Sequence, residues 1–108
     1  MNLQTLAEER SLEYHRVIAS RLADHPEILV AARTWIHQQR SRSSRSQAYL
    51  DRWAEILALP TPHIQQALLD PGEEARALRQ CSPFAGLIAA RERWQIWREV
   101  RERFEAKP

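Results

Sequence analysis

Residues 78–104 read LRQCSPFAGLIAARERWQIWREVRERF, and this stretch decides the fold. A tight turn is predicted at residues 82–86, because Pro83 fixes one backbone angle and Gly86 accepts conformations that other residues avoid. We expect Phe84 to fill an apolar pocket, and Arg79 and Gln80 to bond to backbone carbonyls nearby. Helical patterns flank the turn, so the run is predicted to act as a staple that joins two helices.

The helix expected over residues 89–105 places large aromatic side chains on a charged background. Trp97, Val100 and Phe104 share one face at helical spacing, with Trp94 on its flank. The remaining positions are mostly arginine and glutamate, and Glu99 and Arg103 have the i,i+4 spacing of an ion pair.

Tryptophan and arginine are the residue types most enriched at the energetic centres of protein interfaces. We therefore predict a partner-binding surface on this last helix, made of Trp94, Trp97, Arg98 and Arg101. The alternative is that the tryptophans close the chain's own core. In an intermediate arrangement, one tryptophan lies in the core and the other near the surface.

Apolar residues recur at helical spacing along the rest of the chain, and only two of the 108 residues are glycine. This pattern predicts an all-α fold. We expect a compact bundle of five or six helices in a single domain over residues 1–108, with a long N-terminal helix and a charged, Trp-containing C-terminal helix. The earlier helices are expected at residues 3–23, 24–39, 46–58, 62–69 and 71–80, and a solvated Arg/Ser loop at about residues 40–46.

Three local features complete the predicted helices. Leu3 belongs to the apolar face of the first helix, and Tyr49 belongs to that of the third. Thr61 is expected to cap the fourth helix, because a threonine hydroxyl accepts bonds from free helical N–H groups.

Composition restricts the setting of the protein. The formal net charge is only +2, too small for a polybasic nucleic-acid binder. Cys81 is the only cysteine, which excludes an internal disulfide and a cysteine-based zinc site. No apolar run approaches the roughly 20 residues that span a bilayer, and the first residues are acidic where a signal peptide is basic and apolar. We expect a cytoplasmic protein without a membrane partner.

Catalytic signatures are missing from the sequence. The four histidines have no helical metal-binding spacing between them, and there is no glycine-rich phosphate loop and no GxSxG segment. Glu8 and Glu9 are adjacent, so they point apart on a helix and do not form a two-carboxylate site. We expect no enzymatic activity, no cofactor and no metal.

The densest positive patch in the sequence comprises Arg40, Arg42, Arg45 and Arg52. Arginine and serine side chains bind phosphate oxygens without reading the base sequence. This patch supports an alternative function as a small nucleic-acid-binding transcriptional regulator. The simpler interpretation is a flexible connector. A helix-turn-helix at the third and fourth helices is disfavoured, because HIQQALLD contains no arginine to reach the bases.

Four segments together resemble one family. These are LAEERSLEYHRVIASRL at residues 6–22, YLDRWAEIL at 49–57, ALLDPGEEARALRQCSPFAGLI at 67–88 and RERWQIWREVRERFE at 91–105. The chain is similar to small all-helical antitoxin-like proteins of bacteria and archaea that are encoded just ahead of a nucleotidyltransferase-like toxin. It departs from that pattern at Ala89 and Ala90, where a capping residue and a proline are expected.

The resemblance implies a non-catalytic antitoxin that binds and neutralises a nucleotidyltransferase-like toxin. A nucleotide-binding cleft is usually basic, so the acidic first helix suggests phosphate mimicry. We therefore add Glu8, Glu9 and Glu13 to the predicted partner-binding residues. Operator DNA is a second expected partner, and a homodimer is a further option because a chain this short buries a limited core.

Overall fold

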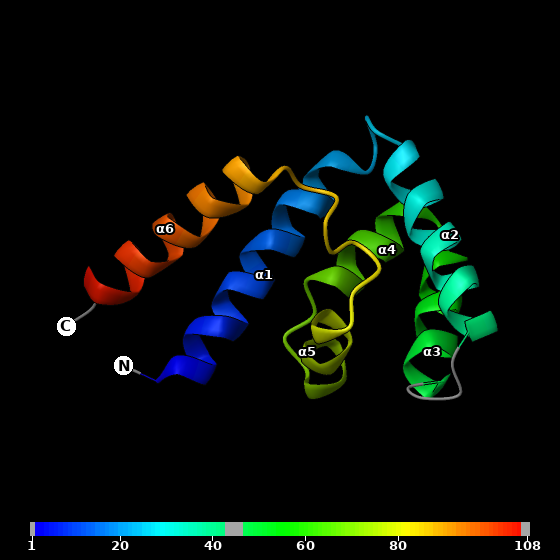
Figure 1. Ribbon diagram of the computed structural model, residues 1–108, viewed down its shortest axis with the longest axis horizontal. Helices are drawn as coiled ribbons and strands as arrows, with labels where there is room; N and C mark the ends of the chain where they lie inside the picture. Colours follow the sequence, from blue (N-terminus) through cyan, green and yellow to red (C-terminus); the bar gives the residue numbers. More distant parts are fainter. Residues whose placement is uncertain (1, 43–46, 107–108) are drawn as a thin grey trace.

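Six helices and no strand make up the part of the chain that the structure describes, which is residues 2–42 and 47–106 of a computed structural model. The all-α prediction is confirmed, including the long first helix (Figure 1). The helices are α1 (Leu3–Arg21), α2 (Glu27–Arg42), α3 (Gln47–Leu57), α4 (Thr61–Leu68), α5 (Glu73–Gln80) and α6 (Ala90–Ala106).

Helix α1 organises the described chain. It packs against α4, α5 and α6, whereas α2 packs on α3, and α3 on α4. Figure 1 shows α1 and α6 side by side and antiparallel at one end of the molecule, α2 and α3 paired at the other end, and α4 and α5 between the pairs. Both chain ends therefore lie at the α1–α6 end. The molecule measures 45 × 31 × 24 Å along its principal axes.

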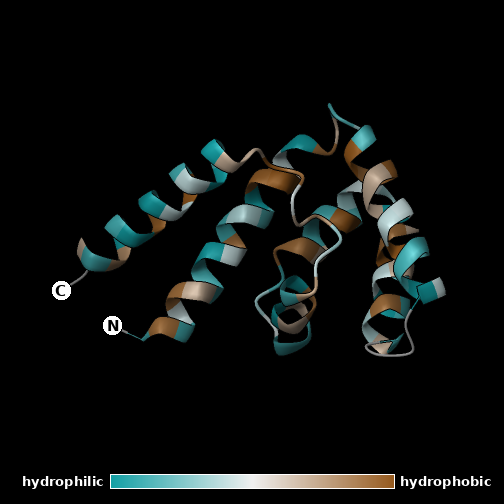
Figure 2. Cartoon of the chain, viewed as in Figure 1, coloured by the Kyte–Doolittle hydropathy of each residue, from teal (hydrophilic) through white to brown (hydrophobic). Residues whose placement is uncertain are grey.

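Trp53 and Phe84 are the largest fully buried side chains of the core. Their rings meet edge to face with centroids 5.9 Å apart, a favoured geometry for aromatic pairs. The Trp53 indole N–H donates to the Leu78 carbonyl at 3.0 Å, which ties α3 to the end of α5. Apolar residues line the inner sides of the helices, and the outer side of α6 is dominated by hydrophilic residues (Figure 2).

The turn between α5 and α6 has the predicted form. Gly86 has a positive φ of 83°, a conformation that costs residues with a Cβ atom. The Ser82 hydroxyl oxygen accepts the Phe84 N–H at 3.0 Å, and Phe84 is completely buried. The linker, yellow in Figure 1, carries the chain from α5 past α1 to the start of α6.

Arg79 carries out its predicted role at the end of the neighbouring helix α4. One guanidinium nitrogen, Nη1, donates to the carbonyls of Leu68 at 3.1 Å and Asp70 at 2.9 Å. These groups lie where a helix leaves carbonyls without intrahelical partners. Gln80 is exposed and makes no such side-chain bond within the described residues, so that half of the expectation was wrong.

Two large residues expected in the core are on the surface. Leu3 is 76% exposed because it occupies the first turn of α1, at the outer end of the helix pair. Tyr49 is 43% exposed, whereas its neighbour Leu50 is buried. Successive helical residues are rotated by about 100°, so the core-facing strip of α3 includes Leu50 and leaves Tyr49 outside.

The predicted Arg/Ser loop is wrong at its beginning, and the predicted cap of α4 is also wrong. Helix α2 continues to Arg42, because Ser41 bonds back to the Gln38 carbonyl at 2.9 Å and Arg40 forms an ion pair with Asp51 of α3. The rest of that loop, residues 43–46, lies outside the described residues. Thr61 is the first helical residue of α4, whose cap position is Pro60.

Candidate functional site

The two tryptophans of α6 have different environments, as in the intermediate arrangement considered from the sequence. Trp97 is half-buried and packs against the core, together with Phe104. Trp94 is 60% exposed, the most exposed aromatic side chain described. Arg98 and Arg101 are exposed on the same helix. The predicted partner surface on α6 is thus physically accessible at Trp94, Arg98 and Arg101, whereas Trp97 is largely occupied within the fold.

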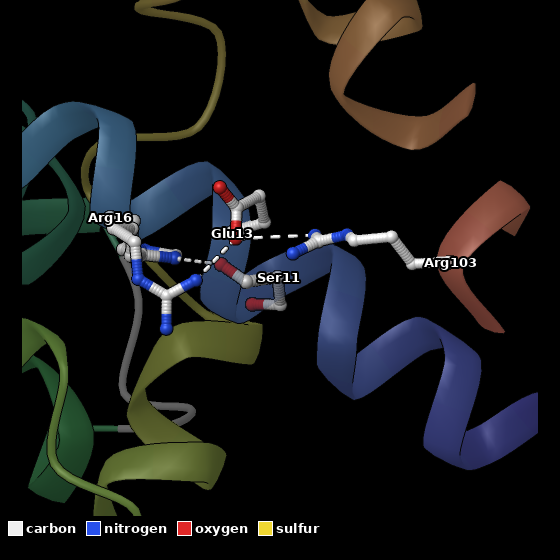
Figure 3. Close-up of polar contacts among 5 residues, drawn as sticks. Ser11, Glu13, Arg16 and Arg103 are labelled. Atoms are coloured by element: carbon white, nitrogen blue, oxygen red, sulfur yellow. Dashed lines mark hydrogen bonds and ion pairs between the residues drawn. The ribbon is translucent and has the colours of Figure 1, made fainter. Parts of the chain in front are cut away.

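The three acidic residues predicted on α1 also differ. Glu13 lies between Arg16 of its own helix and Arg103 of α6, and forms an ion pair with both (Figure 3). Glu8 approaches Arg76 of α5 at 4.0 Å. Glu9 is exposed and forms no ion pair within the described residues. Of these three carboxylates, Glu9 is therefore the most available to a partner.

Ion pairs join the antiparallel helices α1 and α6 at two places. Arg21 pairs with Glu92 near the start of α6, and the bond holds the pKa of Glu92 below its ordinary value. Arg103, near the end of α6, pairs with Glu13 in the middle of α1 at 3.4 Å. The predicted Glu99–Arg103 pair within α6 was wrong, because Arg103 turns toward α1 instead. The i,i+4 pair that does form in α6 joins Arg101 to Glu105 at 3.1 Å.

His15 connects α1 to the turn and is one of the few buried polar side chains, with 2% exposure. Its Nδ1 lies 2.7 Å from the Ser11 carbonyl oxygen, and its Nε2 lies 2.7 Å from the Ser82 hydroxyl. A carbonyl only accepts, so Nδ1 carries the proton and Nε2 accepts from the hydroxyl. Burial lowers the pKa of His15 to about 4, which keeps the ring neutral.

Tyr14, the neighbour of His15, fixes the other side of the same turn. Its hydroxyl donates to the Phe84 carbonyl at 2.6 Å and accepts the Ile88 N–H at 3.3 Å. From the sequence, the histidines carried no assigned role, and the turn was expected to join the fifth helix to the last. Tyr14 and His15 are far from the turn in sequence, so no local pattern indicated that α1 supplies these partners.

A pocket of about 440 Å³ opens beside this junction, between α1, the turn and α6. Its cationic side chains are Arg10 from α1, Arg79 from α5 and Arg93 from α6, and its aromatic walls include Tyr14 and Trp97. None of the described residues that line the pocket is acidic. Sequence reasoning missed this pocket, because its residues come from four separate segments.

Two of the pocket arginines lie over the Trp97 ring. The guanidinium carbon of Arg10 lies 5.8 Å from the centre of the Trp97 ring, and that of Arg93 lies 5.5 Å away. Both distances are within the range of cation–π attraction. The Nε atoms of Arg10 and Arg93 are buried and have no hydrogen-bond partner within the described residues. The one local sequence signal was Arg93 preceding Trp97 by four residues, which puts them on one helix face.

The predicted nucleic-acid patch is only partly available. Arg40 forms an ion pair with Asp51 at 2.9 Å. Arg52 contacts both Glu55 at 3.0 Å and Glu74 at 2.9 Å, and these bonds raise its pKa. Arg42 is exposed at the end of α2, and Arg45 lies outside the described residues. Two of the four predicted arginines therefore already face carboxylates.

In residues 2–42 and 47–106, no three His, Cys, Asp or Glu side chains gather closely enough to hold a metal ion. Within the same part of the chain, no helix has the length and apolar character required to cross a membrane. Comparison of the chain with protein-family models, with curated proteins and with solved structures found no match.

Proposed function

We propose that this protein is a non-catalytic antitoxin, which binds a nucleotidyltransferase-like toxin through the outer surface of α6. The observation that carries the proposal is Trp94, a large aromatic side chain that is 60% exposed on a charged helix. A tryptophan exposed to this extent leaves apolar area in contact with water, and burying it against a partner stabilises a complex. The identity of the partner follows from the family resemblance of residues 67–88 and 91–105.

Arginines and glutamates surround Trp94 with a polar rim. Arg98 follows it by four residues on the same face of α6, and Arg101 is fixed by its ion pair with Glu105. Protein interfaces commonly place an aromatic anchor at the centre and charged groups at the edge, where they steer association. We assign Trp94 as the anchor, with Arg98 and Arg101 as rim contacts.

The acidic residues of α1 have a smaller role in the proposal than the sequence indicated. Glu13 already neutralises Arg16 and Arg103, so its charge is largely offset within the fold. Glu9 is exposed on the same helix and offers a free carboxylate to a basic nucleotide-binding cleft. We propose Glu9 as the phosphate-mimicking group.

The test is co-purification with the protein encoded by the neighbouring gene. We expect the wild-type chain to form a complex and to relieve growth inhibition, and Trp94→Ala to weaken the complex by at least about tenfold, a typical effect at an interface hot spot. Tyr49→Ala is the matched control, because Tyr49 is an exposed aromatic residue on α3 at the opposite end of the molecule. It should bind like wild type.

Failure of the wild-type chain to bind or to neutralise its neighbour contradicts the proposed function. An equal loss of affinity in Trp94→Ala and Tyr49→Ala contradicts the assignment of the partner-binding surface to α6. The mass of the purified complex by light scattering also reports its stoichiometry, including whether the chain is present as a dimer.

The nucleic-acid alternative remains a separate proposal with less support, because Arg40 and Arg52 are ion-paired. It predicts binding to duplex DNA that falls steeply as salt increases, since phosphate contacts release counterions. Arg42→Gln should weaken that binding. If DNA binding is undetectable at low salt, the alternative is wrong.

A further inference from the structure

We propose that the pocket between α1, the turn at residues 82–86 and α6 binds a small organic phosphate. The proposal is independent of the toxin partner. The pocket volume of about 440 Å³ falls within the range of small-molecule sites, which are mostly apolar with a few placed polar groups.

The charge balance of the pocket calls for an anion. Arg10, Arg79 and Arg93 line it, and none of the three forms an ion pair with a carboxylate of the described residues. A guanidinium stays charged at any physiological pH. No acidic residue lines the pocket beside these three guanidinium groups, so a bound anion would offset their positive charge.

Two of these arginines also have unmet hydrogen-bonding capacity. The buried Nε–H groups of Arg10 and Arg93 have no acceptor within the described residues, and an unmet buried donor is costly. Attraction to the Trp97 ring compensates the charges in part, but a ring face does not replace a hydrogen-bond acceptor. Arg79 has a different role, because its Nη1 is already bonded to the Leu68 and Asp70 carbonyls. Arg79 therefore contributes positive charge to the pocket.

Phosphate fits this arrangement better than a carboxylate does. A phosphate monoester carries nearly two negative charges at neutral pH and three acceptor oxygens, so it offsets more of the positive charge than a carboxylate does and offers more hydrogen-bond acceptors. The rings of Tyr14 and Trp97 form an apolar wall that accommodates an apolar or aromatic body attached to the phosphate. We therefore expect an organic phosphate to bind more tightly than inorganic phosphate.

The experiment is an NMR titration of the full chain with phenyl phosphate, with inorganic phosphate and benzoate as comparison ligands. We expect phenyl phosphate to shift the Nε–H signals of Arg10 and Arg93 and the indole signal of Trp97, and to bind more tightly than either comparison ligand. No shift at millimolar phenyl phosphate overturns the proposal. Equal affinity for benzoate and phenyl phosphate contradicts the preference for phosphate over carboxylate. Equal affinity for inorganic phosphate and phenyl phosphate contradicts the proposed contact between the apolar wall and the body of the ligand.

Variants locate the site. Arg10→Gln and Arg93→Gln should each weaken phenyl phosphate binding at least about tenfold, the effect of losing a charge-assisted hydrogen bond. Arg91→Gln is the matched control, because it removes the same charge from an exposed position of α6 outside the pocket, and it should bind as wild type does. Equal weakening in Arg91→Gln would show that binding follows net charge alone and would overturn the site. If Arg10→Gln is too unstable to test, Arg10→Lys serves as a second variant. Because it retains the charge, Arg10→Lys should bind phenyl phosphate better than Arg10→Gln.

Discussion

His15 shows how one residue can be fixed in a role that its neighbours in the sequence do not reveal. A histidine flanked by Tyr14 and Arg16 on an amphipathic helix is usually a surface residue. Here it is buried, and its two nitrogens join α1 to the Ser82 hydroxyl. The determining contact crosses 67 positions of the chain, so it depends on tertiary structure and not on local pattern.

The neutral state of His15 predicts a pH dependence of stability. Its folded pKa of about 4 lies below the ordinary 6.5, so between these values the unfolded chain binds a proton that the folded chain does not. Stability should therefore fall as the pH drops from 6.5 to 4. The loss in the free energy of unfolding that His15 causes over this pH range is about 3 kcal/mol at most. Urea unfolding at several pH values measures it.

The variant His15→Gln removes the titrating ring and should lose most of this pH dependence, although its stability at pH 7 will be lower. His63→Gln is the control, because His63 is exposed on α4. It should retain the dependence of the wild type. A wild-type free energy of unfolding that stays constant from pH 6.5 to pH 4.5 contradicts the prediction.

At the scale of elements, the turn at residues 82–86 was the most predictable feature. Proline, a buried aromatic residue and glycine within five positions specify a tight turn through local chemistry, and Phe84 and Gly86 occupy their expected states. The partners of the turn were not predictable. Tyr14 supplies the hydroxyl that satisfies the Phe84 carbonyl and the Ile88 N–H, and only the packing of α1 brings it there.

Gly86 provides a test of the turn. A Cβ added at this residue meets no atom within 4 Å, so the cost of a substitution comes from the positive φ alone. Gly86→Ala should destabilise the fold by about 1–2 kcal/mol, the cost of a left-handed conformation for an ordinary residue. Gly86→Asn should cost less, because asparagine tolerates this conformation better.

Urea unfolding of the two variants beside wild type measures the effect. If Gly86→Ala matches the wild-type free energy of unfolding, the positive φ does not constrain the turn. If asparagine and alanine cost the same, the cost has another origin, such as altered contact with the pocket.

The ion pairs of α6 mark the limit of prediction from helical spacing. Three i,i+4 combinations of arginine and glutamate occur along RERWQIWREVRERFE, and each contributes only a few tenths of a kcal/mol. Spacing alone does not choose among them. Arg103 instead reaches Glu13 across the helix pair (Figure 3), a contact that exists only because α6 returns antiparallel to α1.

For the whole molecule, helical periodicity gave the fold class, because an apolar strip with a period of 3.6 residues is a property of each segment by itself. The order in which helices pack is a property of pairs, and the sequence alone did not define it. The pocket illustrates the difference. Arg10, Arg79 and Arg93 are unremarkable as single residues, and they form one cationic site only after α1, α5 and α6 are placed.

The packing arrangement predicts that α6 is less stable than α3 and the central part of α1. Within the described chain, α1 is the one helix that α6 packs against beyond isolated contacts. The fully buried side chains of α6 are Ile96 and Val100, whereas the shorter α3 buries Leu50, Trp53, Ile56 and Leu57. Exposed ion pairs such as Arg101–Glu105 add little, typically 0–1 kcal/mol. A helix held in this way can open without unfolding the rest.

Hydrogen exchange followed by mass spectrometry tests this expectation. Amides of α6 should exchange faster than those of α3 and of the central part of α1, with the difference largest without denaturant, where local opening dominates. Equal protection of α3 and α6 would mean that the molecule opens only as one cooperative unit. If α6 does open separately and also carries the partner-binding Trp94, then partner binding should slow exchange in α6 more than in α3, because the partner stabilises the closed helix that it contacts.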